Sequence, residues 1–195
     1  MKVSRVLISA GAVLIAAAVI LTGYNLWDTR RAGLASEAAL EQLSPLIAEE
    51  DPEYPDYVLN PNMSMPIQTV DGLDYVGTLD IPAIDRQLPV LNEWNYGHLK
   101  TAPCLYAGSA YLDNMVICAH NYKKHFGSLK NLRYGDVLSF TDMDGNVFEY
   151  QVIEIETLKP TAVEEMTEGD WDLTLFTCTL GGASRVTVRC EKLLY

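Results

Sequence analysis

The sequence predicts a mainly β domain, a closed or nearly closed eight-stranded β-barrel with short helices, preceded by an N-terminal transmembrane helix. Two observations support this fold class. From about residue 69 onward, short runs of β-branched and aromatic residues alternate with turn residues, and little of the region has a helical pattern. Before it, residues 6–27 contain no charged side chain. Many short strands without long helices favour a barrel.

Eight strand-like runs make up the predicted barrel. Between the fifth and the sixth, Asp144-Gly145-Asn146 is a strong hairpin signal. The sixth run alternates in character, with Phe148, Tyr150 and Val152 on one face, as expected of a strand. The segments 92–101 and 125–132 are compatible with short helices. The expected strands are 75–81, 87–91, 103–108, 115–120, 136–140, 147–155, 173–180 and 185–193.

Charge is unevenly distributed along the chain, which has a net charge of −12 over 195 residues. Residues 1–32 are net basic, residues 33–60 contain acids and no base, and residues 61–195 are net acidic. Non-specific binding to nucleic acid needs a basic face, so this class of function is excluded. The uneven charge and composition divide the chain into three regions, 1–28, 29–68 and 69–195.

The first region is interpreted as a cytoplasmic tip and an uncleaved membrane anchor. Residues 6–27 are long enough for a helix to cross a bilayer, which takes about 20 residues. Lys2 and Arg5 precede this span and Trp27 closes it, which favours an N-terminus inside and the bulk of the chain outside the cell. The alternative is a cleaved signal peptide with small residues at 16–18. Either interpretation predicts export.

The second region, 29–68, is interpreted as an acidic stalk. Residues 30–48 are rich in strong helix formers. Five prolines then follow between positions 45 and 66, and proline supplies no backbone N–H to a helix or a sheet. We therefore expect 49–67 to be extended and to hold the third region away from the membrane.

The four cysteines allow more than one interpretation. An exported chain with Cys104, Cys118, Cys178 and Cys190 could form two disulfides in three pairings. No Cys-x-x-Cys pair is present, which argues against a four-cysteine zinc site. Cys104, Cys118 and Cys190 also fit free core positions within strands. Of the three histidines, His98 and His125 lie in polar surroundings and are expected to be exposed to solvent.

The segment Thr174-Leu175-Phe176-Thr177-Cys178 ends a predicted strand just before a Gly-Gly turn. It resembles the Thr-Leu-x-Thr-Cys signature of the sortases, the cysteine transpeptidases of Gram-positive cell envelopes. The resemblance covers roughly residues 70–195. It places a histidine at the end of an earlier strand, here His120, and an arginine at the start of the strand after the cysteine, here Arg185. Ala119 stands where the family commonly has glycine before this histidine.

The resemblance implies a role for each of these residues. Cys178 would be the nucleophile, His120 the acid/base partner, Arg185 the transition-state stabiliser and Thr177 a substrate-binding residue. Strand periodicity alone does not choose between Arg185 and Arg189, which share a face. The family pattern places the arginine near the cysteine, and two residues along a strand move a side chain about 6–7 Å. Arg185 is therefore preferred.

The chemistry of these residue types agrees with this assignment. Thiolate is the nucleophilic form of cysteine, and a histidine cation beside it stabilises the thiolate and later donates a proton to a leaving amine. Arginine keeps its charge and can stabilise an oxyanion. The resemblance implies cleavage of a sorting signal similar to Leu-Pro-x-Thr-Gly after the Thr, through a thioacyl intermediate. An amine from a cell-wall peptide or a pilin lysine then takes over the acyl group.

No cofactor is predicted. Some sortases bind calcium through acids in the loop before the signature strand, but here a solvated loop is preferred for its acids, Glu164, Glu165, Glu168 and Asp170. The loop is also short for the helix-bearing loop of class B sortases. Asp51-Pro52 with Tyr54 partly matches the lid motif of pilin-building sortases, but the aromatic residue is one place late, so a plain linker is preferred.

The predicted partners are surface proteins with sorting signals, an amine acceptor, and the membrane through residues 6–27. The predicted location is the cell membrane, crossed once, with the catalytic domain outside. Two other functions remain open. One is an exported cysteine peptidase that hydrolyses rather than transfers. The other is a non-catalytic, membrane-anchored β-domain that binds a wall component and has its cysteines in disulfides.

Overall fold

The computed structural model describes residues 2–49 and 55–193. This part of the chain contains one long helix, α1 (Lys2–Leu43), two short helices, α2 (Asp56–Leu59) and α3 (Val163–Thr167), and several short 3-10 helices. Its nine strands are β1 (Gln68–Val70), β2 (Leu73–Ile81), β3 (Arg86–Leu91), β4 (Cys104–Ala107), β5 (Met115–Ala119), β6 (Val137–Asp142), β7 (Val147–Leu158), β8 (Leu173–Cys178) and β9 (Arg185–Lys192).

Eight of these strands form a closed barrel. The strand order is β1-β2-β3-β4-β5-β8-β9-β7-β6, and β6 also pairs with β2, which closes the ring and leaves β1 outside it as a hairpin partner of β2. The β3–β4 and β5–β8 pairs are parallel and the others antiparallel. The predicted eight-stranded barrel is confirmed.

The β6–β7 hairpin has the features that its sequence predicts. Gly145 in the connecting turn has φ of 85°, a conformation that glycine adopts without steric cost. Along β7, Phe148, Tyr150 and Val152 are buried and their neighbours are more exposed, so the first half of the strand has one face on the core. The segments 92–101 and 125–132, where short helices were expected, contain short 3-10 helices at His98–Lys100 and Phe126–Asn131.

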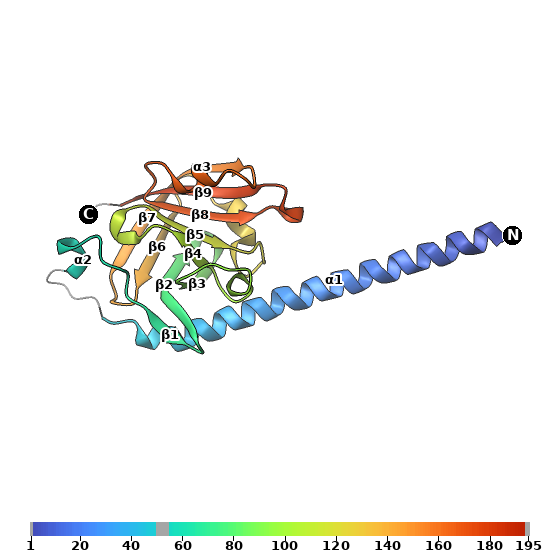
Figure 1. The fold of residues 1–195 in the computed structure, drawn as a ribbon, viewed down its shortest axis with the longest axis horizontal. Helices are drawn as coiled ribbons and strands as arrows, with labels where there is room; N and C mark the ends of the chain where they lie inside the picture. Colours follow the sequence, from blue (N-terminus) through green and yellow to red (C-terminus); the bar gives the residue numbers. More distant parts are fainter. Residues whose placement is uncertain (1, 50–54, 194–195) are drawn as a thin grey trace.

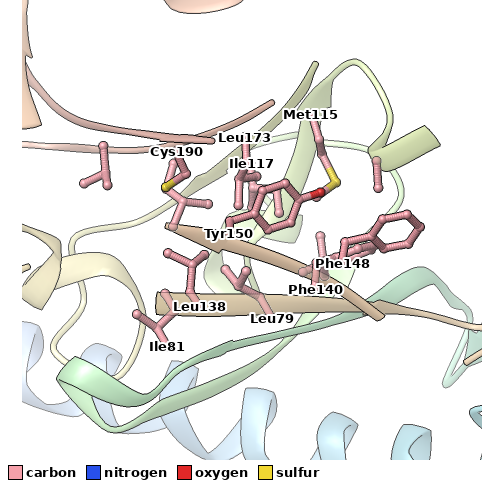
Figure 2. Packing of buried hydrophobic residues seen from close by; sticks show 14 of the residues in the cluster. Leu79, Ile81, Met115, Ile117, Leu138, Phe140, Phe148, Tyr150, Leu173 and Cys190 are labelled. Carbon is pink, nitrogen blue, oxygen red and sulfur yellow. The ribbon is translucent and has the colours of Figure 1, made fainter. Parts of the chain in front are cut away.

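The barrel interior is filled by large apolar side chains from most of its strands (Figure 2). Phe140 and Phe148 face each other from adjacent strands with ring centroids 6.3 Å apart. Fully burying a side chain of this size stabilises a fold by about 1.5–3 kcal/mol. The closed, densely packed interior leaves binding and chemistry to the strand ends and the loops.

Helix α1 has two halves with different surroundings. Its first half projects away from the barrel (Figure 1), and the apolar side chains there are exposed. By length and composition, the helix could cross a membrane. The second half lies against the barrel, where Ala39 and Leu43 join a second apolar cluster that includes Tyr75 and Leu91. No break separates the two halves at residue 28.

The region expected to form a stalk, 29–68, packs against the barrel along much of its described length. After α1, the Ala48 N–H donates to the carbonyl of Met143 at 3.1 Å. Further on, the Tyr57 ring of α2 stacks on Tyr111 with centroids 4.6 Å apart, and Met65 is buried. Apolar residues between the prolines provide these contacts, so this region differs from a free spacer. The lid-like positions Asp51, Pro52 and Tyr54 lie outside the described residues.

Candidate active site

Parallel strands β5 and β8 bring His120 and Cys178 to the same edge of the barrel. Ala119 pairs with Thr177 in the parallel register. The next residue on each strand is His120 and Cys178, and neighbouring strands lie about 4.8 Å apart. The Thr177 hydroxyl donates to the Ala119 carbonyl at 2.8 Å, which ties the two strand ends together. Two residues 58 positions apart in sequence therefore lie side by side.

The turn between β8 and β9 places Arg185 directly across from Cys178. The two residues are partners in the antiparallel register. The turn is closed by hydrogen bonds from the Thr179 N–H to the Ser184 carbonyl at 2.9 Å and from the Gly182 N–H to the Thr179 carbonyl at 2.8 Å. Gly181 and Gly182 have φ of 81° and 73°, which explains the Gly-Gly pair. The structure thus brings the three predicted catalytic residues together.

All three residues line one hollow of about 230 Å³, called here the first hollow. One side of it is aromatic: Trp94 lies 5.3 Å from Tyr106, and Tyr106 lies 5.2 Å from Phe176, measured between ring centroids. Its other lining residues include Pro160, Ala162, Val163 and Met166 from the loop that contains α3. An apolar wall with a few converging polar groups is typical of a binding site for an organic ligand or a peptide.

A second hollow of about 280 Å³ also reaches Cys178. It lies along the segment that follows His120, and its lining residues include Asn121, Lys123, Gly127, Lys130 and Thr179 but no carboxylate. Both lysine side chains are exposed. Cys178 therefore borders two different environments, one aromatic and one basic.

Cys178 is the half-exposed member of a set of four free cysteines. The other three thiols are buried. Burial raises the pKa of Cys104 to about 12, and it raises the pKa of Cys118 and Cys190 as well. These three sites therefore stay protonated and unreactive at neutral pH, as expected for core positions. Cys118 also lines the first hollow, but it is 4% exposed, whereas Cys178 is half-exposed and borders both hollows.

His120 is partly buried, and burial lowers the pKa of its imidazole because it disfavours the charged form. The carboxylate of Asp28 in α1 has the opposite influence on this pKa, and the Lys100 ammonium lowers it further. The His120 ring lies 5.0 Å from the ring of Tyr122, centroid to centroid. The charge state of His120 thus depends on groups outside its own strand.

The two arginines of β9 have different surroundings. Arg185 is half-buried, lines the first hollow, and donates to the carbonyls of Gly182 at 3.3 Å and Ser184 at 3.2 Å. Arg189 is 2% exposed and lies four residues further along, where it pairs with Glu156 at 2.8 Å. It also donates to the Thr174 hydroxyl at 3.0 Å and to backbone carbonyls at the end of α3. The Arg189 side chain therefore has a structural role.

Thr177, predicted to bind substrate, borders both hollows, but its side chain is 4% exposed and its hydroxyl is bonded to the Ala119 carbonyl. The expectation that His98 and His125 are both exposed is wrong for His125, which is fully buried. The backbone of Ala32 in α1 lies beside its imidazole, and the docking of this helix has no local signal in the sequence. Burial lowers the pKa of His125 to about 4. His98 is half-buried.

Sequence reasoning did not find the aromatic residues of the first hollow or the Asp28–Tyr122 contact beside His120. Trp94, Tyr96 and Tyr106 cluster in a short segment, and this aromatic density was the available signal. Asp28 and Tyr122 are 94 residues apart, and no pattern links them. Within residues 2–49 and 55–193, no group of three or more His, Cys, Asp or Glu side chains is placed to hold a metal ion. The acids at 164, 165, 168 and 170 form no such group there.

A model of the sortase domain matches residues 79–193, more than half of the chain. Among solved structures, the chain is similar to sortase C1 from Streptococcus agalactiae, with 25% identity and a TM-score of 0.57 over 70% of this chain and 75% of that one. It is also similar to Clostridium perfringens sortase C with its C-terminal cell wall sorting motif, with 24% identity and a TM-score of 0.59 over 82% and 97%.

A third structure, the Clostridium perfringens sortase D5 transpeptidase, matches with 20% identity and a TM-score of 0.57 over 71% of this chain and 94% of that one. Among curated proteins, no significant sequence match was found. The barrel, the site at the ends of β5, β8 and β9, and the domain match define the class: the chain belongs to the sortase family. Membership implies cysteine transpeptidase activity and leaves the subclass open.

Proposed function

We propose that this chain is a membrane-anchored sortase that cleaves a sorting signal similar to Leu-Pro-x-Thr-Gly after the Thr and transfers the acyl group to an amine. Cys178 is the nucleophile, His120 the acid/base residue and Arg185 the transition-state stabiliser. The observation that supports this proposal best is the convergence of these three side chains on one aromatic hollow at a single barrel edge.

In the first half-reaction, the sorting peptide lies in the first hollow and the Cys178 thiolate attacks the carbonyl carbon of the Thr. The carbonyl oxygen becomes an oxyanion, which the Arg185 guanidinium stabilises. The C–N bond to the following Gly then breaks. His120 in its cationic form donates a proton to the departing amine. The products are a thioester at Cys178, neutral His120 and a free peptide amine.

In the second half-reaction, the acceptor amine attacks the thioester carbonyl. Neutral His120 takes the proton that the amine loses, the C–S bond breaks, and Cys178 returns to the thiolate. The new amide joins the sorted protein to its acceptor, and His120 ends as a cation, as at the start. Each proton taken up in one half-reaction is released in the other, so no further reactant is needed.

The second hollow supports a separate approach for the acceptor. While the acyl chain occupies the first hollow, Cys178 remains open from the side of Lys123 and Lys130. The two ammonium groups favour an acceptor that has a carboxylate near its reacting amine. They also disfavour a protonated amine there, and the unprotonated amine is the form that reacts. A cell-wall peptide is an acceptor of this chemistry.

Residues 6–27 are proposed to cross the membrane once, with the N-terminus inside and the barrel outside the cell. The exposed apolar surface of this half of α1 supports the proposal. The solved Clostridium perfringens neighbour contains a C-terminal cell wall sorting motif, and this supports a substrate of the same kind here.

The proposal is tested with the full chain in phospholipid nanodiscs and a library of Leu-Pro-x-Thr-Gly-like peptides, with and without an amine acceptor. We expect intact mass spectrometry to detect a thioacyl adduct, absent from Cys178→Ala, and the acceptor to convert it into a ligated product. Hydrolysis that the amine does not alter would indicate a peptidase. Absence of both adduct and cleavage across the library would favour a wall-binding domain.

A further inference from the structure

The half of α1 that follows the apolar span, residues 28–43, is called here the docked half. Ala32, Ser36, Ala39 and Leu43 are buried and recur at intervals of four, three and four residues, so they share one face of the helix. Figure 1 shows this half of the helix beneath the barrel and the other half projecting away from it. The docked half is a continuous extension of the span, and it begins with Asp28.

Asp28 connects this helix to the segment that follows His120. The Tyr122 hydroxyl donates to Asp28 Oδ2 at 2.5 Å. On its other oxygen, Asp28 accepts from Arg31 Nη2 at 3.0 Å and from Arg31 Nε at 3.3 Å. The Arg31 guanidinium in turn lies 6.0 Å from the Trp27 ring centroid. The carboxylate is therefore held in one orientation by bonds on both oxygens.

Tyr122 connects this carboxylate to the site. It follows His120 by two residues, and its ring lies 5.0 Å from the imidazole at an interplanar angle of 58°. Tyr122 also meets the ring of His125 edge to face at 5.5 Å. The phenol ring thus contacts two imidazoles while its hydroxyl is bound to Asp28. A ring fixed at both its edge and its tip restricts where the His120 side chain can lie.

The electrostatics of His120 agree with this arrangement. Burial and the Lys100 ammonium lower the pKa of the imidazole, although the first half-reaction needs its cation, and the Asp28 carboxylate opposes both influences. Charged or titratable groups face His120 from several elements of the structure. They are Asp28 and Arg31 of α1, Lys100 of the 3-10 turn before β4, Tyr122 and His125 after β5, Cys178 of β8 and Arg185 of β9.

We propose that Asp28 is a positioning residue for His120: through its hydrogen bond to Tyr122 it fixes the ring beside the imidazole, and its negative charge favours the imidazolium. The residue that ends the membrane span would then act on the catalytic centre. Because His120 has a catalytic role only under the proposed function, the test needs a readout that does not depend on turnover.

That readout is the titration of His120, followed by NMR in the full chain with isotope-labelled histidine in nanodiscs and assigned by the signal missing from His120→Ala. We expect Asp28→Asn to move the titration midpoint to lower pH by roughly 0.5–1 pH unit, less than the 1–3 units typical of an opposite charge in direct contact. Tyr122→Phe keeps the ring and should shift it less. The double variant should have the same midpoint as Asp28→Asn, because the two substitutions act on the same Asp28–Tyr122 hydrogen bond and their effects are therefore not additive.

Glu37→Gln is the matched control. Glu37 pairs with Lys124 at 2.8 Å, so it joins the same helix to the same loop but has no contact with His120. We expect this variant to leave the titration unchanged. An unchanged midpoint in Asp28→Asn, or an equal shift in Glu37→Gln, would overturn the positioning role and leave Asp28 as one of several docking contacts.

Acylation of Cys178 by a sorting peptide gives the second readout. In Asp28→Asn the rate at neutral pH should fall by about 3- to 10-fold, since one pH unit changes the cationic fraction tenfold. The pH profile should shift by the same amount as the NMR midpoint. If the native chain forms no thioester, the proposed function fails, but the NMR titration still decides whether Asp28 acts on His120.

Discussion

Toward each end of the β8–β9 strand pair, an arginine of β9 lies opposite a thiol or hydroxyl residue of β8, and the two ends differ in how fully these polar groups are bonded. At one end, Cys178 faces Arg185 beside two hollows, and both residues are half-buried. At the other end, Thr174 pairs with Arg189, which is buried and bonded to a carboxylate, a hydroxyl and backbone carbonyls. The end at Cys178 is called here the open end and the end at Arg189 the closed end. The comparison indicates that chemistry can take place where the polar side chains of a strand pair remain accessible and are not fully hydrogen-bonded.

The largest effect is expected at the open end from Cys178→Ala. Without the thiol no thioester forms, so turnover should fall by at least about 10⁴-fold, as with other nucleophile knockouts. The side chain is half-exposed, so stability should change by less than about 0.5 kcal/mol. Peptide cleavage and thermal unfolding measure the two quantities. Cys190→Ala is the control at the closed end: it should lower stability and keep activity, and the reverse pattern would mean that the nucleophile is misassigned.

Next in size is the loss of the Arg185 guanidinium. Arg185→Ala should lower kcat/KM by about 10²–10³-fold, the usual loss for one oxyanion donor. Arg185→Lys should recover only part of it, because an ammonium lacks the planar fork of donors. Steady-state kinetics on folded protein provide the measurement. A variant with native kcat/KM would remove Arg185 from the mechanism.

At the closed end, Arg189→Ala should lower the free energy of unfolding. It leaves Glu156 without its partner and the α3 carbonyls without their donor. Breaking a fully buried pair costs 3–5 kcal/mol, and we expect about 2–3 kcal/mol because the Glu156 side chain keeps 29% of its exposure. Chemical denaturation measures the loss. Unchanged stability combined with lost catalysis would exchange the roles of the two arginines.

A similar contrast in burial separates the two histidines, since His120 is partly buried and His125 is fully buried. Burial lowers the pKa of His125 to about 4, whereas a histidine in the unfolded chain has a pKa near 6.5. Between these values the unfolded state binds the extra proton, so stability is complete above about pH 6.5 and falls as the pH falls toward 4. From pH 7 to 5 the loss should be about 2 kcal/mol by denaturant titration. His125→Phe should reduce this slope; an unchanged slope would contradict the assignment.

The smallest effect is expected in the second hollow. Removing both ammonium groups with Lys123→Ala and Lys130→Ala should raise KM for an acceptor with a carboxylate by about 3- to 5-fold, because exposed charges contribute little. The KM for an amine that lacks the carboxylate, such as glycinamide, should not rise. Lys159→Ala, outside both hollows, is the control. Equal effects on both acceptors would mean that the lysines do not recognise charge.

Much of the barrel could be predicted from the sequence, because period-two alternation and turn residues act locally. The strands expected at 115–120 and 185–193 agree with β5 and β9 within two residues. The signature around Cys178 pointed to the right strand end. Periodicity could not separate Arg185 from Arg189, since both lie on one face; their difference depends on Glu156 and α3, which come from other parts of the chain.

The docking of α1 could not be predicted for a related reason. An apolar span followed by strong helix formers has the same pattern whether or not the helix continues onto a protein surface. The buried face uses the small residues Ala32, Ser36 and Ala39, which give a weak hydrophobic signal. The burial of His125 and the Asp28–Tyr122 bond both depend on this docking, so neither could be read from local sequence.

Helix α1 runs without a break from the apolar span onto the outer surface of the barrel, so under the proposed topology it sets the distance between the bilayer and the site. Under the proposed topology, Asp28 lies at the bilayer surface and bonds to Tyr122, two residues from His120, so the catalytic centre has a fixed and low height above the lipid. A substrate held in the same bilayer then needs only a short spacer, since each extended residue spans about 3.3–3.6 Å. Enzyme and substrate would search for each other in two dimensions, at an effective concentration that their shared membrane sets.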